Sequence, residues 1–149
     1  MKFNSRNESA RKALGLAALL LGVFALSSCG GGGSGTNYHP EAIAAAAEAL
    51  QKADLPHRVM VDCSHGNSNK DHNRQGEVAH NVLAQRLAGN DAIIGIMLES
   101  HLFAGRQDLI DGKAEKYGVS VTDACIDWDS TVELLASLHQ QMLPVQAVA

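Results

Sequence analysis

The sequence of 149 residues is poor in aromatic residues, proline and cysteine. Phe, Tyr and Trp together make up only 4% of it, so we expect an aliphatic core. The three cysteines, Cys29, Cys63 and Cys125, show neither the close spacing of a zinc site nor a paired pattern, and we expect no disulfide framework. The chain also lacks a basic block and has a formal net charge of −4, which argues against nucleic acid as the main partner. Its length suits one modest domain.

The N-terminus has the charge order of a secretory signal. Basic residues, the last of them Lys12, precede an apolar run from Ala13 to Leu26. Roughly 14 apolar residues are too few for a membrane-spanning helix, which needs about 20. The segment Leu26-Ser27-Ser28-Cys29 resembles a bacterial lipobox. We interpret residues 1–29 as a signal or lipoprotein-like leader, Cys29 as a lipidation candidate and residues 30–36 as a Gly-rich linker or fusion junction. The alternative is an apolar helix of a soluble domain.

Helical and strand-like patterns alternate over residues 37–143, ahead of a short tail at 144–149. The expected elements are a helix over 41–53, a strand over 58–62, a helix over 74–88, a strand over 92–98, a long loop over 99–118, a β-like stretch over 119–121 and a last helix capped by Asp129 or Ser130. Both strands are apolar without alternation, which indicates a parallel sheet buried on both faces. This pattern predicts the α/β class, built from βα units.

Several apolar side chains are expected to pack inward from the helices. For the helix over 74–88 they are Val78, Val82, Leu83 and Leu87, and for the last helix they are Val132, Leu135, Leu138 and Met142. Trp128 is also expected to pack. Two strands alone neither close a barrel nor make a well-covered sheet, so this material is incomplete as a fold.

Residues that can bind a metal follow the strand-like segments. His65 and Glu99 come after the two apolar strands, and Asp123 follows residues 119–121. Because the carboxyl ends of parallel strands are where α/β proteins assemble their sites, one imidazole and two carboxylates there suggest a divalent-metal site. Such a donor set suits Mn²⁺, Fe²⁺ or Co²⁺. From spacing alone, a hydrogen-bonded structural histidine and solvated carboxylates remain the simpler alternative.

Other polar residues near these segments have weaker claims. Strand alternation places Cys63 on the same side as His65, one step deeper. His101 is a candidate partner of a metal ligand. Two interpretations are open for Asn67, Ser68 and Lys70. They could bind phosphate at the start of a helix, or they could have ordinary turn and capping roles. Three histidines are expected on the surface or in loops, namely His57, His72 and His80.

Four segments carry a family resemblance. DCSHGNSNK (62–70), IGIMLESHL (94–102), SVTDACI (120–126) and Gly35-Thr36-Asn37-Tyr38 closely resemble the C-terminal part of class I 3-deoxy-D-arabino-heptulosonate 7-phosphate (DAHP) synthase. The resemblance runs from about Gly32 to Met142. It implies the C-terminal βα units of a TIM (β/α)₈ barrel, incomplete in this chain. It also implies condensation of phosphoenolpyruvate with erythrose 4-phosphate, the cytoplasmic first step of aromatic amino-acid synthesis by the shikimate pathway.

The resemblance also implies a ligand set. The family holds a divalent metal with one Cys, one His, one Glu and one Asp, and His65, Glu99 and Asp123 match the last three. The family's Cys and most of its phosphate-binding Arg and Lys residues lie in a region with no counterpart here. A further family Arg is replaced by Gly31. We do not expect Cys63 or Cys125 to replace the missing thiolate.

Three hypotheses therefore stay open. The chain is a DAHP-synthase fragment with little activity alone, or a lipid-anchored, non-catalytic and possibly metal-binding protein that reuses the segment. In the third, another chain supplies the missing part of the barrel. In the first case we expect the apolar faces and strand edges left uncovered to cause poor solubility or self-association.

Overall fold

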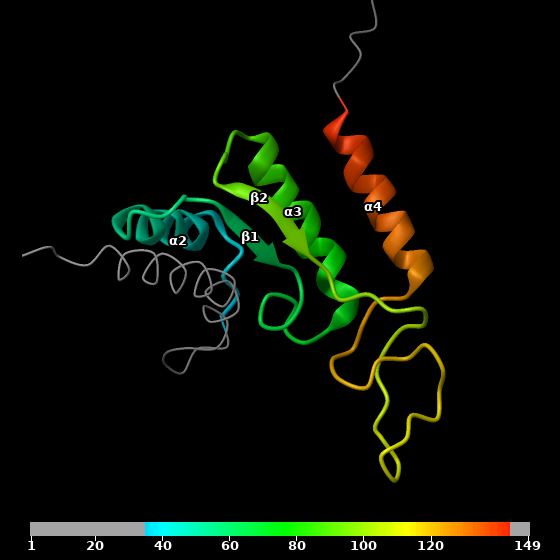
Figure 1. The fold of residues 1–149 in the computed structure, drawn as a ribbon. Helices are drawn as coiled ribbons and strands as arrows, with labels where there is room; N and C mark the ends of the chain where they lie inside the picture. Colours follow the sequence, from blue (N-terminus) through cyan, green and yellow to red (C-terminus); the bar gives the residue numbers. More distant parts are fainter. Residues whose placement is uncertain (1–34, 144–149) are drawn as a thin grey trace, which may run out of the picture. The chain divides into compact units, whose positions relative to one another are not determined.

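The computed structural model describes residues 35–143, so the predicted leader over 1–29 with Cys29 and the tail over 144–149 lie outside the described residues. Figure 1 shows the order of elements along the chain. They are α2 (Pro40–Lys52), β1 (Val59–Asp62), the 3₁₀ turn η1 (His72–Arg74), α3 (Gln75–Leu87), β2 (Ile93–Met97) and α4 (Trp128–Met142). No helix within residues 35–143 has the length and apolarity to span a membrane.

Helix α2 forms where the sequence predicts it. Pro40 occupies the first turn, where its missing N–H is not needed, and Glu41 and Lys52 have the charges favoured at the two helix ends. Ile43 is its one fully buried side chain. The helix stops before Asp54, whose φ of +56° lies in the left-handed region. This boundary confirms the expected stop at residues 54–56.

Strands β1 and β2 pair in parallel, as predicted, and form a two-stranded sheet. The register places Met60 opposite Gly95 and Asp62 opposite Met97, with an irregularity after the first pair. Because the strands are parallel, their carboxyl ends point the same way and bring the segments after Asp62 and Met97 to one edge. Helix α3 and the preceding turn connect the two strands (Figure 1).

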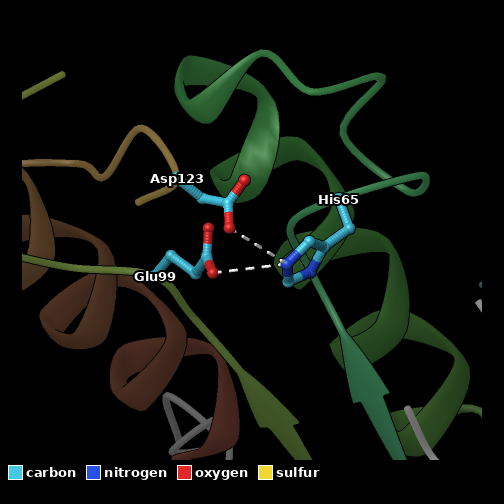
Figure 2. Close-up of side chains that lie close together, drawn as sticks. All are labelled: His65, Glu99 and Asp123. Atoms are coloured by element: carbon cyan, nitrogen blue, oxygen red, sulfur yellow. Dashed lines mark ion pairs between the residues drawn. The ribbon is translucent and has the colours of Figure 1, made fainter. Parts of the chain in front are cut away.

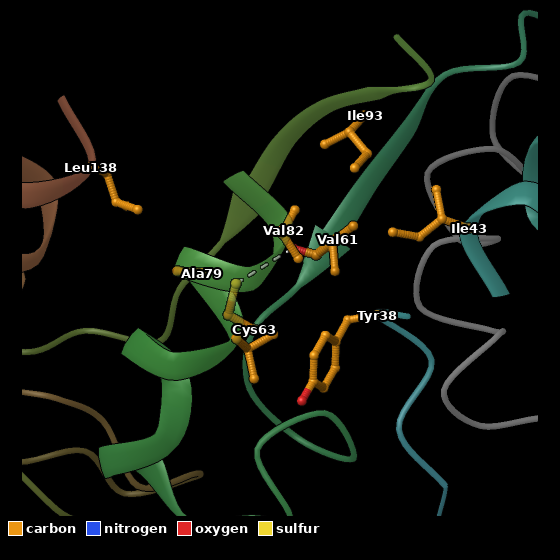
Figure 3. Packing of buried hydrophobic residues seen from close by; sticks show 9 residues of the cluster. Tyr38, Ile43, Val61, Cys63, Ala79, Val82, Ile93 and Leu138 are labelled. Carbon is orange, nitrogen blue, oxygen red and sulfur yellow. Dashed lines mark hydrogen bonds between the residues drawn. The ribbon is translucent and has the colours of Figure 1, made fainter. Parts of the chain in front are cut away.

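The core lies on one face of this sheet. Val61 and Cys63 pack between Val82 of α3 and Tyr38 near α2, as Figure 3 shows. Ile93 of β2 completes this aliphatic cluster, together with Ile43, Val78, Ala79 and Leu138. The sequence predicted such an aliphatic core, and Val78 and Val82 of α3 are buried as expected. Leu87 is not, because it lies in the last turn of α3 and is 55% exposed.

The opposite face of the sheet is open. Met60 is 43% exposed and Ile94 is 58% exposed, so the prediction of burial on both faces is wrong within residues 35–143. The apolar pattern of the strands is that of a fully covered parallel sheet. Residues 35–143 supply layers for one face only, and the second face keeps its apolar side chains without a cover.

The long segment between β2 and α4 contains no helix or extended strand among the described residues. Isolated bridges hold it together, including Ser100 with Ile126, Gly105 with Cys125 and Arg106 with Ser120. The expected β-like stretch over 119–121 therefore consists of a single bridge at Ser120. Residues 102–103 also pack closely on Gly118, which has a φ of +73°.

Helix α4 differs from the prediction in its start and in its covered face. It begins at Trp128, and its cap is Asp127, whose side chain accepts a hydrogen bond of 2.8 Å from Ser130 N–H. Leu138 is buried and Leu134 packs against the core, so these two residues define the covered face. The other residues that were expected to face inward are exposed, namely Val132, Leu135 and Met142. Trp128, which was also expected to pack, is 60% exposed.

Candidate metal site

His65 lies in the turn that follows β1. Strand pairing ends at Asp62, and residues 65–70 fold into turns that include a hydrogen bond of 2.8 Å from Lys70 N–H to the His65 carbonyl. His65 itself has a φ of +45°, in the left-handed region. This backbone conformation ends the strand's alternation of side chains. The imidazole thereby lies at the carboxyl edge of the sheet, beside the segment that leaves β2.

The predicted common face of His65 and Cys63 is wrong for the same reason. Cys63 has no exposed surface and packs in the core, with Sγ 4.0 Å from the Val61 carbonyl. Burial, together with the negative charge of Asp62, raises the pKa of the Cys63 thiol to about 12. Metal binding requires a thiolate. Cys63 is therefore a core residue and is both turned away from His65 and difficult to ionise.

Glu99 follows β2 and is held by its backbone. The side chain of Gln75, fully buried at the start of α3, donates from Nε2 to the Glu99 carbonyl at 3.0 Å. Its Oε1 accepts from Glu99 N–H at 2.7 Å. Such a pair of bonds fixes both the position and the direction of the backbone. The Glu99 carboxylate then projects toward His65 (Figure 2).

Asp123 comes from the loop before α4 and lies on the same side of His65 as Glu99 (Figure 2). The bridges of Gly105 with Cys125 and of Ser100 with Ile126 tie this loop to the segment after Glu99. The Asp123 carboxylate remains 64% exposed, whereas the Glu99 side chain is 20% exposed. Asp123 is thus the most open member of the set.

The three side chains converge as the sequence predicted. His65 Nε2 lies 3.4 Å from Glu99 Oε1 and 3.9 Å from Asp123 Oδ2. One potential ligand atom from each residue lies within 4.8 Å of the others. Figure 2 shows all three pointing into one space between the loop ends. Among residues 35–143, these three are the only group of His, Cys, Asp and Glu side chains so arranged.

The electrostatics of the cluster favour a cation. Burial lowers the pKa of His65, but the hydrogen bond and charge of Asp62, followed by the charges of Glu99 and Asp123, raise it by more, so that the pKa lies above its usual value. The surroundings therefore stabilise positive charge at His65. A divalent ion held by His65, Glu99 and Asp123 would supply that charge in place of a proton.

The donor set fits a borderline divalent ion. Two ligand atoms that are each about 2.1 Å from one ion lie roughly 3 to 4 Å apart, depending on the angle between them. Both distances from His65 Nε2 fall in this range. One nitrogen and two carboxylate oxygens suit Mn²⁺, Fe²⁺ or Co²⁺. The described residues thus supply three candidate ligand atoms.

The other polar candidates have structural contacts. Asn67 is buried, and its amide accepts from Asn37 N–H at 2.6 Å and donates to the Asp62 carbonyl at 2.7 Å. Ser68 is also buried and donates to the His65 carbonyl at 3.3 Å. These contacts favour the turn-stabilising interpretation of both residues over phosphate binding. Lys70, with a φ of +61°, is exposed.

The remaining histidines lie apart from the cluster. The imidazole of His101, the candidate partner of a metal ligand, contacts the Gly118 carbonyl instead of a cluster residue. It borders an open hollow lined by residues 114–122. His57 is exposed, as expected. His80 accepts a hydrogen bond of 2.9 Å from Gln141, and His72 belongs to the turn η1, where it is partly exposed.

Sequence reasoning missed the residues that orient the ligands. Asp62, Ser64 and Gln75 all bond to His65 or Glu99. The alternation of β1 did place Asp62 and Ser64 on the face opposite Cys63, which is the face of the site. Continuing the alternation to His65 predicts the opposite face for the site, because the positive φ of His65 is not visible in the sequence. No pattern in the sequence around Gln75 indicates its contact with Glu99.

Comparisons with known proteins bear on this cluster. A family model described as the DAHP synthetase I family matches residues 23–136. The match overlaps the predicted leader over residues 23–29, starts before the expected Gly32 and ends before Met142. The chain is 51% identical over 112 residues to a protein of Enterobacter agglomerans named "Phospho-2-dehydro-3-deoxyheptonate aldolase, Tyr-sensitive", covering 74% of this chain and 53% of that one.

Other proteins of this family match a similar share of the chain. A protein of the same name from Escherichia coli (strain K12) is 49% identical over 112 residues, with coverage of 74% of this chain and 32% of the relative. The structure of phospho-2-dehydro-3-deoxyheptonate aldolase from Francisella tularensis SCHU S4 superposes with a TM-score of 0.65 at 44% identity. It covers 74% of this chain and 32% of that chain. The chain thus spans about a third to a half of the length of these relatives.

Proposed function

Because the chain belongs to the DAHP synthetase I family, we propose that it carries the metal-binding part of a barrel that condenses phosphoenolpyruvate with erythrose 4-phosphate. The observation that carries the proposal is the convergence of His65, Glu99 and Asp123. These residues are the catalytic and metal-ligand candidates, and the Mn²⁺, Fe²⁺ or Co²⁺ type of ion is the cofactor. A bound ion of this kind supplies Lewis acidity, which polarises the aldehyde of erythrose 4-phosphate.

The residues of this chain contribute binding and orientation. His65 offers Nε2, and Glu99 and Asp123 each offer a carboxylate oxygen, from three separate loops. Because Glu99 is fixed through Gln75 and His65 through its turn, two of the ligands are preorganised. Asp123 is the most exposed of the three. The fourth ligand and the phosphate-binding residues are expected to come from outside residues 35–143.

We therefore propose that the chain alone has little synthase activity and that a partner carrying the missing barrel segments is required. The uncovered sheet face with Met60 and Ile94 supports this, since strands of a closed barrel have neighbours on both edges and side chains filling the interior. Mixing with a chain that supplies the remaining barrel should start phosphoenolpyruvate consumption. The variant His65→Ala should abolish it, and His57→Ala, an exposed histidine outside the cluster, should not.

Metal binding by the full chain is the direct test. Titration with Co²⁺, followed by its visible absorption and by calorimetry, should show one site. His65→Ala, Glu99→Gln and Asp123→Asn should each weaken binding at least tenfold, while the control His57→Ala should match the parent chain. Equal Co²⁺ affinity in the parent and in all three ligand variants would contradict the proposed site.

The leader pattern supports a second candidate function. In this proposal the chain is a lipid-anchored, non-catalytic protein in which the segment binds metal, and Cys29 carries the lipid. The support is the basic segment, apolar run and Leu26-Ser27-Ser28-Cys29 sequence. A labelled fatty acid should then be incorporated and lost in Cys29→Ser. A synthase role predicts instead that the chain is found in the cytoplasmic fraction without lipid.

A further inference from the structure

Asp62 bonds to the imidazole atom of His65 that faces away from the other cluster residues. Its Oδ2 lies 2.7 Å from His65 Nδ1, and its side chain is only 12% exposed. An ionised carboxylate is an acceptor only, so Nδ1 is the donor in this bond. In the neutral imidazole the proton then resides on Nδ1, and Nε2 has a free lone pair. That lone pair is directed to the side of Glu99 and Asp123.

Ser64 links the same carboxylate to Glu99. Its backbone N–H donates to Asp62 Oδ1 at 2.7 Å, and its hydroxyl donates to Glu99 Oε2 at 2.9 Å. Ser64 is buried, with 4% of its surface exposed. Asp62 therefore uses both oxygens in fixed hydrogen bonds, Oδ1 with Ser64 and Oδ2 with His65, whereas Glu99 uses Oε2 with Ser64. In Glu99 the remaining oxygen, Oε1, is the one nearest His65 Nε2.

We propose that Asp62 and Ser64 are positioning residues for the metal ligands, Asp62 by fixing the Nδ1–H tautomer of His65 and Ser64 by fixing the carboxylate of Glu99. This inference rests on the proposed metal function. The four residues form a continuous hydrogen-bonded path from His65 through Asp62 and Ser64 to Glu99, across the carboxyl ends of both strands. Residues that orient ligands in this way affect metal affinity by about 10- to 100-fold.

A purely structural role for Asp62 makes a different prediction. The bond from Ser64 N–H to Oδ1 closes a local turn, which an asparagine side chain also supports. In Asp62→Asn, the amide oxygen keeps this turn bond, and the amide NH₂ replaces Oδ2. The amide NH₂ then donates to His65 Nδ1 and stabilises the Nε2–H tautomer, which has no lone pair on Nε2 for a metal. The variant should fold and still bind metal poorly.

The test compares Co²⁺ binding by the full chain and its variants. Asp62→Asn and Ser64→Ala should weaken Co²⁺ binding by about 10- to 100-fold. Their circular dichroism should equal that of the parent, and their unfolding midpoints should differ from the parent's by no more than that of a surface variant. Asp91→Asn is the matched control, because it makes the same change at an exposed carboxylate paired only with Arg86. Parent-like Co²⁺ affinity and absorption in both variants would overturn the proposal.

Nitrogen NMR of His65 separates this inference from the proposed metal function. At about pH 9.5, above the ordinary histidine pKa of about 6.5, the metal-free parent chain should show Nδ1–H and Asp62→Asn should show Nε2–H. If the parent binds no Co²⁺ but shows this change of tautomer, the metal function fails and the positioning role of Asp62 stands. If the parent shows Nε2–H, or if the tautomer is the same in both proteins, the positioning role is wrong whatever the Co²⁺ result.

Discussion

The side-chain amide of Gln75 is hydrogen-bonded to both backbone groups of Glu99, to the carbonyl at 3.0 Å and to the N–H at 2.7 Å. Gln75 is fully buried at the start of α3, and Glu99 follows the next strand. This one side chain therefore joins the helix to the ligand-bearing end of β2. It gives the Glu99 backbone the two hydrogen bonds that a neighbouring strand normally supplies.

Replacing Gln75 tests how much this contact stabilises the fold. Gln75→Leu keeps most of the volume and removes both hydrogen bonds, so that two backbone groups of Glu99 lose their partner. We expect the free energy of unfolding in urea to fall by about 2–4 kcal/mol. Gln51→Leu, at an exposed position of α2, is the control and should change it by less than about 0.5 kcal/mol. Equal losses in the two variants would show that the contact is dispensable.

The thiol of Cys63 is packed in the core, and this predicts low reactivity in the native chain. Burial raises the pKa of Cys63 to about 12, so its thiol is protonated at pH 8 and is a poor nucleophile. Cys63 should therefore resist iodoacetamide in the native chain and react readily in urea. Peptide mass spectrometry resolves each cysteine separately. Modification of Cys63 at the same rate with and without urea would contradict the packed core around it.

The elements of this fold are predictable from sequence because they depend on local patterns. Pro40 and Asp54 mark the ends of α2, and the uninterrupted apolar runs of β1 and β2 indicate a parallel pair. Which side chains of these elements are covered is harder to predict. Leu135 and Met60 read as inward-facing, since the sequence reports that a residue is apolar but not whether the layer that covers it is present.

The sequence predicts the three candidate ligands that converge here, but not the residues that support them. His65, Glu99 and Asp123 follow strand-like segments, and the family resemblance singles them out. Gln75 lies 24 residues from its partner Glu99 in sequence, and no local pattern connects them. Cys63 was misplaced because a positive φ at His65 cannot be read from an apolar pattern. Long-range hydrogen bonds and single-residue turns thus account for the errors at this site.

The cap of α4 predicts a pH effect on stability. Hydrogen bonds from Ser130 lower the pKa of Asp127 below its usual value. A lowered pKa in the folded state means that the ionised side chain stabilises the fold at pH values above the unfolded-state pKa of about 3.9. This stabilisation is lost as the pH falls through the lower, folded-state pKa. Thermal unfolding followed by circular dichroism measures it.

The comparison variant for this prediction is Asp127→Asn. Asparagine caps a helix about as well as aspartate does. Near pH 7 the melting temperatures of the variant and the parent should therefore differ only by the effect of the lost charge at the helix N-terminus. Below about pH 4 the difference between the two proteins should shrink, because the parent side chain becomes neutral. A difference that stays constant from pH 7 to pH 2 would show that Asp127 does not titrate with folding.

Gly118 and Gly112 form a matched pair for testing the loop before Asp123. Both have a φ of +73°, but an added Cβ at Gly118 meets Phe103 Cδ2 at 2.9 Å, whereas an added Cβ at Gly112 meets nothing within 4 Å. Both alanine variants carry the backbone cost of about 1 kcal/mol. Gly118→Ala should cost about 1–3 kcal/mol more, as overpacking does. Urea unfolding of the two variants measures the difference, and equal values would show that the Phe103 contact yields freely.

The uncovered apolar surfaces predict association of the chain. Ile94, 58% exposed on the open sheet face, and Leu135, 51% exposed on α4, are large side chains that a soluble domain normally covers. The two strands also have free edges among the described residues. Sedimentation should therefore show self-association that grows with concentration. Ile94→Lys and Leu135→Lys should each shift the chain toward monomer.

Added charge alone also raises solubility, so Ala45→Lys, at an exposed position of α2, is the control for the lysine itself. It should leave the association unchanged if the apolar surfaces are responsible. A parent chain that remains monomeric at all concentrations and unfolds cooperatively would contradict the prediction. It would mean that one covered face of a two-stranded sheet suffices for an independent fold, and the need for a complementing barrel segment would then rest on the missing ligands alone.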